Sequence, residues 1–111
     1  MKVGIDITKN ERFSKIIGEY SKYSKILSEK EIAIFEKISL EKRKLEYVAS
    51  RFACKEALYK AINNNIPFCK ISILNDETGR PYIECEELKD KNISVSLSHE
   101  DKYSTAIVII E

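Results

Sequence analysis

The sequence contains no tryptophan, a single histidine and only three cysteines among its 111 residues. An odd number of cysteines without paired metal-ligand spacing argues against a disulfide framework and against a structural zinc site. We therefore expect Cys54, Cys69 and Cys85 to behave as small, buried apolar residues. Unpaired thiols fit a protein of the reducing cytoplasm.

Glycine and proline are also scarce, with three and two residues respectively, and they are too scattered to mark a linker. We expect one domain over residues 1–111. No apolar run is long enough to span a bilayer and no signal pattern opens the chain, so we expect no membrane partner. The net charge of +1 and the absence of tryptophan also disfavour binding to nucleic acid.

Hydrophobic periodicity predicts helices in the first half of the chain and strands in the second, after one N-terminal strand. A capping box at Ser28 and Glu31 should start one helix, and the asparagines at 63–65 with Pro67 should end another. The expected fold is α+β, with helices packed against a small antiparallel sheet. The predicted helices cover 9–17, 28–38 and about 40–62, and the strands cover 1–7, 71–73, 82–85, 93–98 and 104–110.

The last predicted strand is apolar on both faces. Ala106, Val108 and Ile110 alternate with Ile107 and Ile109, so both faces should be covered, by the chain's own helices or by another subunit. A chain of this length also gains from extra burial in an oligomer.

Two carboxylates interrupt otherwise apolar patterns. Glu56 continues the apolar stripe of the long helix, where an unpaired charge would cost several kcal/mol. An i, i+4 ion pair with Lys60 is the simple alternative. Asp6 lies in a strand rich in β-branched residues, and a strand end that meets solvent would also explain it. A metal ion that needs oxygen ligands would recruit both carboxylates.

Basic residues surround the N-terminus of the same helix, where the helix dipole attracts anions. The run Lys42, Arg43 and Lys44 is compatible with phosphate recognition, although a solvated helix face would have the same composition. His99 ends a strand beside Glu100, where a structural role and a ligand-binding role are both open.

Three segments together resemble the holo-acyl-carrier-protein synthase family, the small bacterial phosphopantetheinyl transferases. The first is Gly-Ile-Asp-Ile at 4–7 with Arg12. The second is Arg-Phe-Ala-Cys-Lys-Glu-Ala-Leu-Tyr-Lys-Ala at 51–61. The third is Gly-Arg-Pro-Tyr at 79–82, followed by Ser-Leu-Ser-His at 96–99. The resemblance covers essentially the whole chain.

This resemblance implies a transfer of 4′-phosphopantetheine from coenzyme A to a serine of apo acyl carrier protein, with release of adenosine 3′,5′-bisphosphate. It implies a homotrimer with active sites at the subunit interfaces. Asp6 and Glu56 would be catalytic ligands of Mg²⁺, with Mn²⁺ as the alternative ion, and Lys60 would stabilise the phosphates. Either Glu56 or a water on the ion would take the serine proton.

By the same resemblance, basic residues from several segments would bind coenzyme A, while Arg12 and Lys15 would meet the acidic carrier protein. The segment at 63–67 departs from the glycine-rich family pattern, which leaves a non-catalytic coenzyme A-binding module as the alternative. The implied coenzyme A contacts are Lys42, Arg43, Arg51, Lys55, Lys60, Ser98 and His99, with Arg80 and Pro81 reaching in from a neighbouring subunit.

Overall fold

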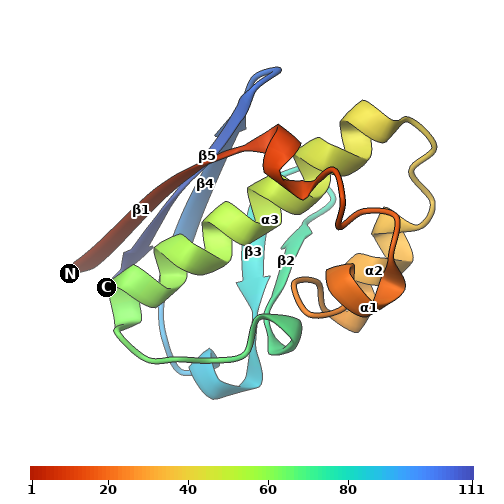
Figure 1. Cartoon of the computed structure of the whole chain (residues 1–111). Helices are drawn as coiled ribbons and strands as arrows, with labels where there is room; N and C mark the ends of the chain where they lie inside the picture. The colour runs from red at the N-terminus through yellow and green to blue at the C-terminus, as the bar shows by residue number, and fades with distance from the viewer.

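One long helix lies across a three-stranded antiparallel sheet in the computed structural model, which describes residues 1–111 (Figure 1). None of the helices combines the length and apolar character that a bilayer crossing requires. In chain order the elements are β1 (Lys2–Lys9), η1 (Asn10–Phe13), α1 (Tyr20–Tyr23), α2 (Glu29–Phe35), α3 (Glu41–Ile62), η2 (Phe68–Lys70), β2 (Ser72–Asn75), β3 (Pro81–Glu84), η3 (Glu86–Leu88), β4 (Ile93–His99) and β5 (Tyr103–Ile110).

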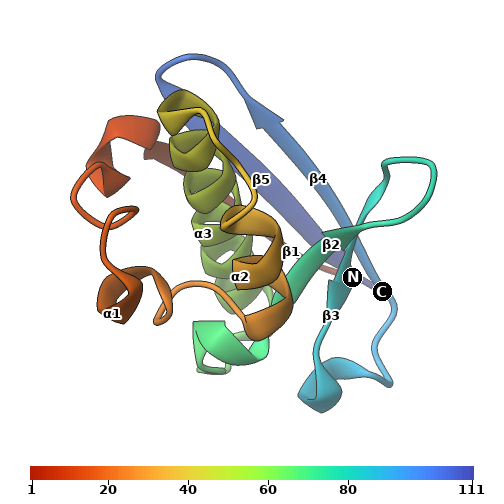
Figure 2. The ribbon, with the colours of Figure 1, turned by 90° about the vertical axis from the view of Figure 1, so that its right-hand side faces the viewer.

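The main sheet has the strand order β1-β5-β4, with every neighbouring pair antiparallel. Asp6, Ala106 and Leu97 stand in one row across it, because Ala106 is the register partner of both others. Lys2 pairs with Ile110, which brings the two chain ends side by side (Figure 2). The α+β architecture expected from the sequence is confirmed, although β2 and β3 form a second, separate sheet.

Helix α3 is the centre of the molecule, between the main sheet and the layer that contains α1 and α2 (Figure 2). Burial therefore extends around its middle turns rather than along one stripe, and fully buried residues include Ala53, Cys54, Lys55, Ala57 and Leu58. The helix ends at Asn63, which adopts a left-handed conformation with φ of 53°. Asparagine tolerates this conformation better than most residues, so it replaces the usual C-terminal glycine.

The predicted helix over 9–17 is wrong. Strand β1 continues its pairing with β5 as far as Lys9, opposite Tyr103, and only a short 3-10 turn follows. Asn10 is held by this pairing, because its side chain donates to the Glu100 carbonyl at 2.9 Å and accepts from Ser104 at 2.6 Å. Contacts between residues about ninety positions apart thus override the local helical pattern.

The capping box predicted at the start of α2 is confirmed, with Ser28 and Glu31 each accepting from the other's backbone N–H. The helix ends at Phe35, short of the predicted 38. In the β2–β3 hairpin, the turn depends on Gly79 at φ of 91°. The Asp76 carboxylate accepts from the backbone N–H groups of Thr78 and Arg80 there.

The two faces of the main sheet differ in cover. Ala106, Val108 and Ile110 are buried against α3, whereas Ile107 and Ile109 on the opposite face are only half-buried. Three further residues of that outer face are exposed: Val3 at 57%, Ile5 at 60% and Ile7 at 64%. The chain itself leaves this apolar face bare.

Of the three cysteines, Cys54 and Cys85 are buried as expected, and the prediction for Cys69 is wrong because it is exposed. Burial raises the pKa of the Cys54 thiol to about 12, so this thiol stays protonated and behaves as an apolar core residue.

Candidate functional site

Asp6 and Lys60 form an ion pair that joins β1 to the C-terminal half of α3. Lys60 Nζ lies 3.1 Å from Asp6 Oδ1 and donates a 2.9 Å hydrogen bond to the Ile5 carbonyl. The Asp6 side chain is 16% exposed and that of Lys60 is 51% exposed. Asp6 is therefore an interior strand residue with a cation beside it, and not a strand end that meets solvent.

Glu56 lies one helical turn before Lys60 and is half-buried. The i, i+4 ion pair between Glu56 and Lys60 does not form, because the lysine pairs with Asp6 instead. Glu56 is thus left without a cation in the chain. A half-buried carboxylate without a partner is the kind of group that a bound cation stabilises.

Strand β1 and helix α3 run in opposite directions, and Asp6 meets the helix at Lys60, one turn after Glu56. Gly4 packs against Ala57, and Phe13, further along the chain, packs against Phe52 with ring centroids 5.1 Å apart. Successive residues of the N-terminal segment therefore meet successively earlier residues of the helix (Figure 1). Glu56 lies between the helix residues of these two contacts, and Lys60, which pairs with Asp6, lies one turn after Glu56.

This pair of carboxylates suits Mg²⁺. The ion demands oxygen ligands and typically binds one or two carboxylates, with substrate phosphates and water in the remaining positions. No group of three or more His, Cys, Asp or Glu side chains lies together in the structure, so the chain does not build a closed metal cage by itself. Two carboxylates on facing elements fit an ion shared with a phosphate ligand.

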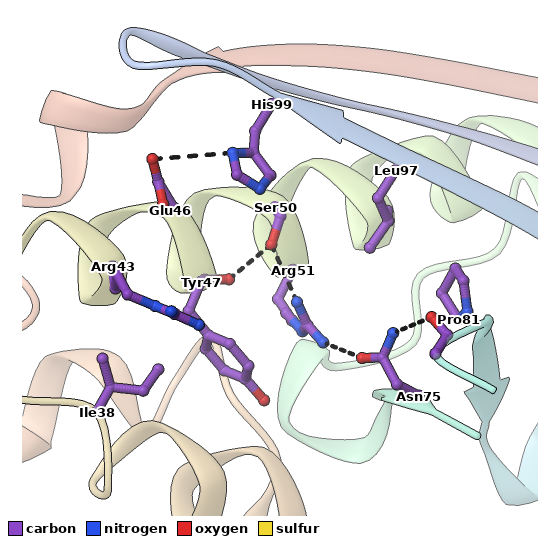
Figure 3. Close-up of a pocket in the computed structure, with 11 residues that line it drawn as sticks. Ile38, Arg43, Glu46, Tyr47, Ser50, Arg51, Asn75, Pro81, Leu97 and His99 are labelled. Carbon is purple, nitrogen blue, oxygen red and sulfur yellow. Dashed lines mark hydrogen bonds and ion pairs between the residues drawn. The ribbon is translucent and has the colours of Figure 1, made fainter. Parts of the chain in front are cut away.

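A cleft of about 520 Å³ opens between the N-terminal half of α3, the end of β4 and the β2–β3 turn (Figure 3). Four of the residues implied as coenzyme A contacts line it: Arg43, Arg51, Pro81 and His99. The remaining wall residues are Ile38, Glu46, Tyr47, Ser50, Asn75, Gly79 and Leu97. Cationic, aromatic and small side chains together suit a ligand with phosphates and an aromatic base.

Arg51 anchors the wall of this cleft. Its guanidinium donates to the Ile73 carbonyl at 3.3 Å, to Ser50 Oγ at 3.2 Å and to Asn75 Oδ1 at 3.1 Å. Asn75 in turn donates to the Gly79 carbonyl at 2.8 Å. Arg51 is only 9% exposed. The arginine therefore holds the hairpin turn in place, whatever further contact its remaining N–H groups make with a ligand.

Tyr47 lies beneath this arginine, with the Arg51 guanidinium carbon 4.1 Å from its ring centroid. Its hydroxyl is buried without a hydrogen-bond partner. Burial raises the pKa of Tyr47 to about 12, against an ordinary value of 10.0. The hydroxyl is therefore neutral at physiological pH and can donate a hydrogen bond to a ligand or water that reaches it.

His99 and Glu46 face each other across the rim of the cleft, with His99 Nδ1 3.8 Å from Glu46 Oε2 (Figure 3). This separation is an ion-pair distance but too long for a hydrogen bond. The other ring nitrogen of His99 is free to contact a phosphate. His99 thus lines the cleft, and Glu46 is a neighbour that the sequence patterns did not reveal.

Lys55 requires a correction, because its side chain is not in contact with solvent. Its ammonium is fully buried and donates to Glu31 Oε1 at 2.5 Å, the Ile26 carbonyl at 2.7 Å and the Phe68 carbonyl at 3.0 Å. All three donors are thereby used. Burial lowers the Lys55 pKa, and Glu31 opposes this shift. We therefore remove Lys55 from the expected coenzyme A contacts.

The other implied contacts lie at the surface. Arg80 and Ser98 are exposed, and Ser98 faces the outer side of the sheet beside Thr105. Lys42 is paired with Asp101 at 2.7 Å near the cleft end of α3. Pro81 lines the cleft of its own chain.

Arg12 and Lys15 are both exposed near η1. The Arg12 guanidinium carbon lies 4.8 Å from the Phe52 ring centroid, and its Nη1 donates a 3.4 Å hydrogen bond to Thr8. Stacking on an aromatic face holds the side chain while leaving its charge accessible. This arrangement suits contact with an acidic protein surface.

The carboxylate pair and Arg51, which anchors the wall of the cleft, lie on different faces of α3. At 100° per residue, Glu56 is rotated by about 140° from Arg51 around the helix axis, and Lys60 by about 180°. Arg51 faces the cleft, whereas Lys60 faces β1. The carboxylate pair and Arg51 therefore project from different faces of α3.

Three comparisons relate this chain to known proteins. The model of the 4′-phosphopantetheinyl transferase superfamily matches residues 2–108. A holo-[acyl-carrier-protein] synthase of Anoxybacillus flavithermus is 41% identical over 114 residues, which cover 98% of this chain and 93% of the relative. The crystal structure of a holo-(acyl-carrier-protein) synthase from Bacillus anthracis in complex with CoA (3′,5′-ADP) superposes with a TM-score of 0.86 at 29% identity, covering 98% of this chain and 94% of that chain. A Helicobacter pylori holo-[acyl-carrier-protein] synthase in complex with coenzyme A gives a TM-score of 0.81 at 27% identity, covering 98% and 99%.

Proposed function

This chain belongs to the 4′-phosphopantetheinyl transferase superfamily and to its holo-acyl-carrier-protein synthases, and we propose that it transfers 4′-phosphopantetheine from coenzyme A to a serine of apo acyl carrier protein. We further propose that the transfer depends on Mg²⁺, which Mn²⁺ could replace. The observation that supports this proposal is the ion pair between Asp6 on β1 and Lys60 on α3, one helical turn after the half-buried, unpaired Glu56. We assign the reaction to the cytoplasm and to the supply of active carrier for fatty acid synthesis.

The proposed reaction is a phosphoryl-group displacement. The carrier serine oxygen attacks the β-phosphorus of the coenzyme A diphosphate, a new P–O bond forms, and the bond to the departing phosphate oxygen breaks. Adenosine 3′,5′-bisphosphate leaves with the electron pair of that bond. The serine supplies the nucleophile, so the transferase needs only to bind, orient and neutralise charge.

Three side chains of this site have distinct roles in the proposal. Asp6 and Glu56 would hold the Mg²⁺, which when bound neutralises charge on the diphosphate. Glu56, which has no lysine partner, is also the group of this chain available to accept the serine proton. Lys60 is long and half-exposed, so it can move from Asp6 to a phosphate oxygen.

We propose that the complete active site forms between two chains of a homotrimer. Glu56 and the cleft residue Arg51 project from different faces of α3, so a second subunit would present its cleft to the carboxylate pair of the first. The bare apolar face of the main sheet, with Val3, Ile5 and Ile7 exposed, provides surface for such an assembly. Arg12 and Lys15 would then guide the acidic carrier to the site.

The direct test is mass spectrometry of an apo carrier protein after incubation with this chain, coenzyme A and Mg²⁺. We expect the carrier to gain one phosphopantetheine and to remain unmodified when EDTA is added. Asp6→Asn and Glu56→Gln should each abolish transfer while the protein stays folded. Transfer by either variant would remove that residue from the proposed ion site, and no transfer by the unsubstituted chain with several carriers would refute the function.

Subunit complementation tests the shared site. Asp6→Asn damages the carboxylate side and Arg43→Ala damages the cleft side, so each homotrimer should be inactive or weak. Mixed trimers formed by unfolding and refolding the two variants together would contain some sites with neither substitution. Activity well above that of either variant supports the shared site, whereas activity no higher than theirs contradicts it.

A further inference from the structure

Gly4 lies at the place where β1 crosses the C-terminal half of α3. A Cβ atom at this position would stand 1.9 Å from the Ala57 carbonyl oxygen and 3.0 Å from the Ala61 backbone nitrogen. Both neighbours are helix backbone, which cannot rotate aside as a flexible side chain can. Strand and helix would have to move apart until these contacts reached ordinary values, so the observed approach requires glycine.

This crossing is next to the site residues in both elements. Ala57 follows Glu56 directly, and Ala61 follows Lys60 directly. Gly4 and Asp6 are two positions apart and so share one face of the strand. A change in separation at Gly4 is therefore transmitted to the gap between Asp6 and the helix residues that it faces, because packed interiors transmit strain.

We propose that Gly4 is a positioning residue, which sets the separation between Asp6 on β1 and Glu56 with Lys60 on α3. The inference rests on the proposed function, in which the two carboxylates share one divalent ion. An ion with short, fixed oxygen distances tolerates little change in the spacing of its ligands. Gly4 would then act on ion binding without contact to the ion.

The other two glycines do not have this role. A Cβ atom on Gly18 or Gly79 would meet no atom within 4 Å, and Gly79 is required by its positive φ rather than by space. Close packing against backbone is thus specific to the glycine nearest the carboxylate pair.

The test measures binding of Mn²⁺ in the presence of coenzyme A, from the electron paramagnetic resonance signal of the free ion. We expect Gly4→Ala to weaken Mn²⁺ binding by about 10- to 100-fold, as other changes that displace metal ligands do. Val108→Ala is the matched control, because Val108 is the fully buried register partner of Gly4 on β5. It opens space in the same core without adding atoms at the crossing, so its Mn²⁺ affinity should stay that of the unsubstituted chain.

Circular dichroism establishes that each variant is folded under the assay conditions. If Gly4→Ala is unfolded, the Mn²⁺ affinity of Ala61→Val is measured instead, because this substitution adds bulk to the same crossing from the helix side. A folded crossing variant with unchanged Mn²⁺ affinity overturns the inference, as does an equal loss in Val108→Ala. Failure of the unsubstituted chain to bind Mn²⁺ with coenzyme A, or to modify a carrier, overturns the proposed function itself and is seen without any variant.

Discussion

Lys55→Met tests whether the buried Lys55 is a structural residue, as its contacts indicate, or a ligand-binding residue, as its motif suggests. The substitution keeps the length of the side chain but removes the ammonium. Glu31 would then remain in the core without its cation, and the carbonyls of Ile26 and Phe68 would lose their donors. All of these groups lie in one network that joins α2, α3 and the segment before β2.

The magnitude follows from this burial. Removing one partner of a buried ion pair costs about 3–5 kcal/mol, because the remaining charge is stranded in the interior. A domain of this kind has a free energy of unfolding of about 5–15 kcal/mol, so a large share of the total would be lost. Both side chains of the pair have no exposed surface, so solvent does not screen the effect.

The matched control is Lys60→Met on the same helix. Lys60 pairs with Asp6 at a site where half of the lysine side chain is exposed. Such pairs contribute about 0–1 kcal/mol, so this variant should be nearly as stable as the unsubstituted chain. For activity we expect the opposite order of effects. Lys60→Met should lower kcat although it is stable, whereas Lys55→Met, where it remains folded, should have an unchanged KM for coenzyme A.

Urea unfolding followed by far-ultraviolet circular dichroism measures the loss, at one fixed protein concentration because assembly contributes to stability. Adding Glu31→Gln to Lys55→Met removes the stranded charge and keeps one of the two side-chain oxygens that accept from the Ser28 and Ile73 N–H groups. We expect the double variant to recover about 1–3 kcal/mol relative to Lys55→Met alone. A cost below about 1 kcal/mol for Lys55→Met, or further loss in the double variant, would refute the reasoning.

Four further outcomes are expected. Asn63→Val should cost at least about 1 kcal/mol more than Asn63→Gly in urea unfolding, because a β-branched residue resists the left-handed conformation. Tyr47→Phe should raise the unfolding free energy by about 1 kcal/mol by removing an unpartnered hydroxyl. The pKa of Tyr47 is about 12 in the folded protein and 10.0 ordinarily, so the unfolded chain loses this proton first as pH rises. The free energy of unfolding should therefore fall between pH 10.0 and about 12, and Tyr47→Phe should reduce this fall. Ile5→Lys should shift the sedimentation coefficient towards that of a monomer by placing a charge in the proposed interface. Arg12→Glu should lower kcat/KM for the carrier at low salt, with a difference that shrinks as salt screens the charge.

The parts of the fold that could be predicted from the sequence are those fixed by local chemistry. The capping box at Ser28 and the asparagine at 63 mark helix ends through their own side chains or backbone, so α2 and α3 were located without tertiary information. The error at 9–17 has the opposite cause. The hydrogen bonds of Asn10 go to residues near 100 and 104, and no local pattern reveals such partners.

The residues of the candidate site also differ in whether local sequence or distant contacts determine their roles. Asp6 and Glu56 stood out because a carboxylate in an apolar pattern requires a partner, but their role as ion ligands was implied only by the family resemblance. Lys55 could not be separated from Lys60 by charge or motif. Glu31, which defines the role of Lys55, is 24 positions away and was already explained as a capping residue. Glu46 and Asn75 were missed because ordinary surface positions and cleft positions look alike before the hairpin is placed.

The pairing of Lys60 with Asp6 has a consequence for how the proposed enzyme uses its ion. The lysine already compensates the strand carboxylate, so the chain can fold without metal, unlike domains whose ligands repel one another until an ion binds. In the proposed site two carboxylates, one of them occupied by this lysine, would hold a strongly hydrated ion only weakly. A diphosphate adds oxygen ligands for the ion and offers Lys60 a new partner, which frees Asp6. Ion binding and coenzyme A binding should therefore reinforce each other, and by linkage each should raise the affinity for the other by the same factor.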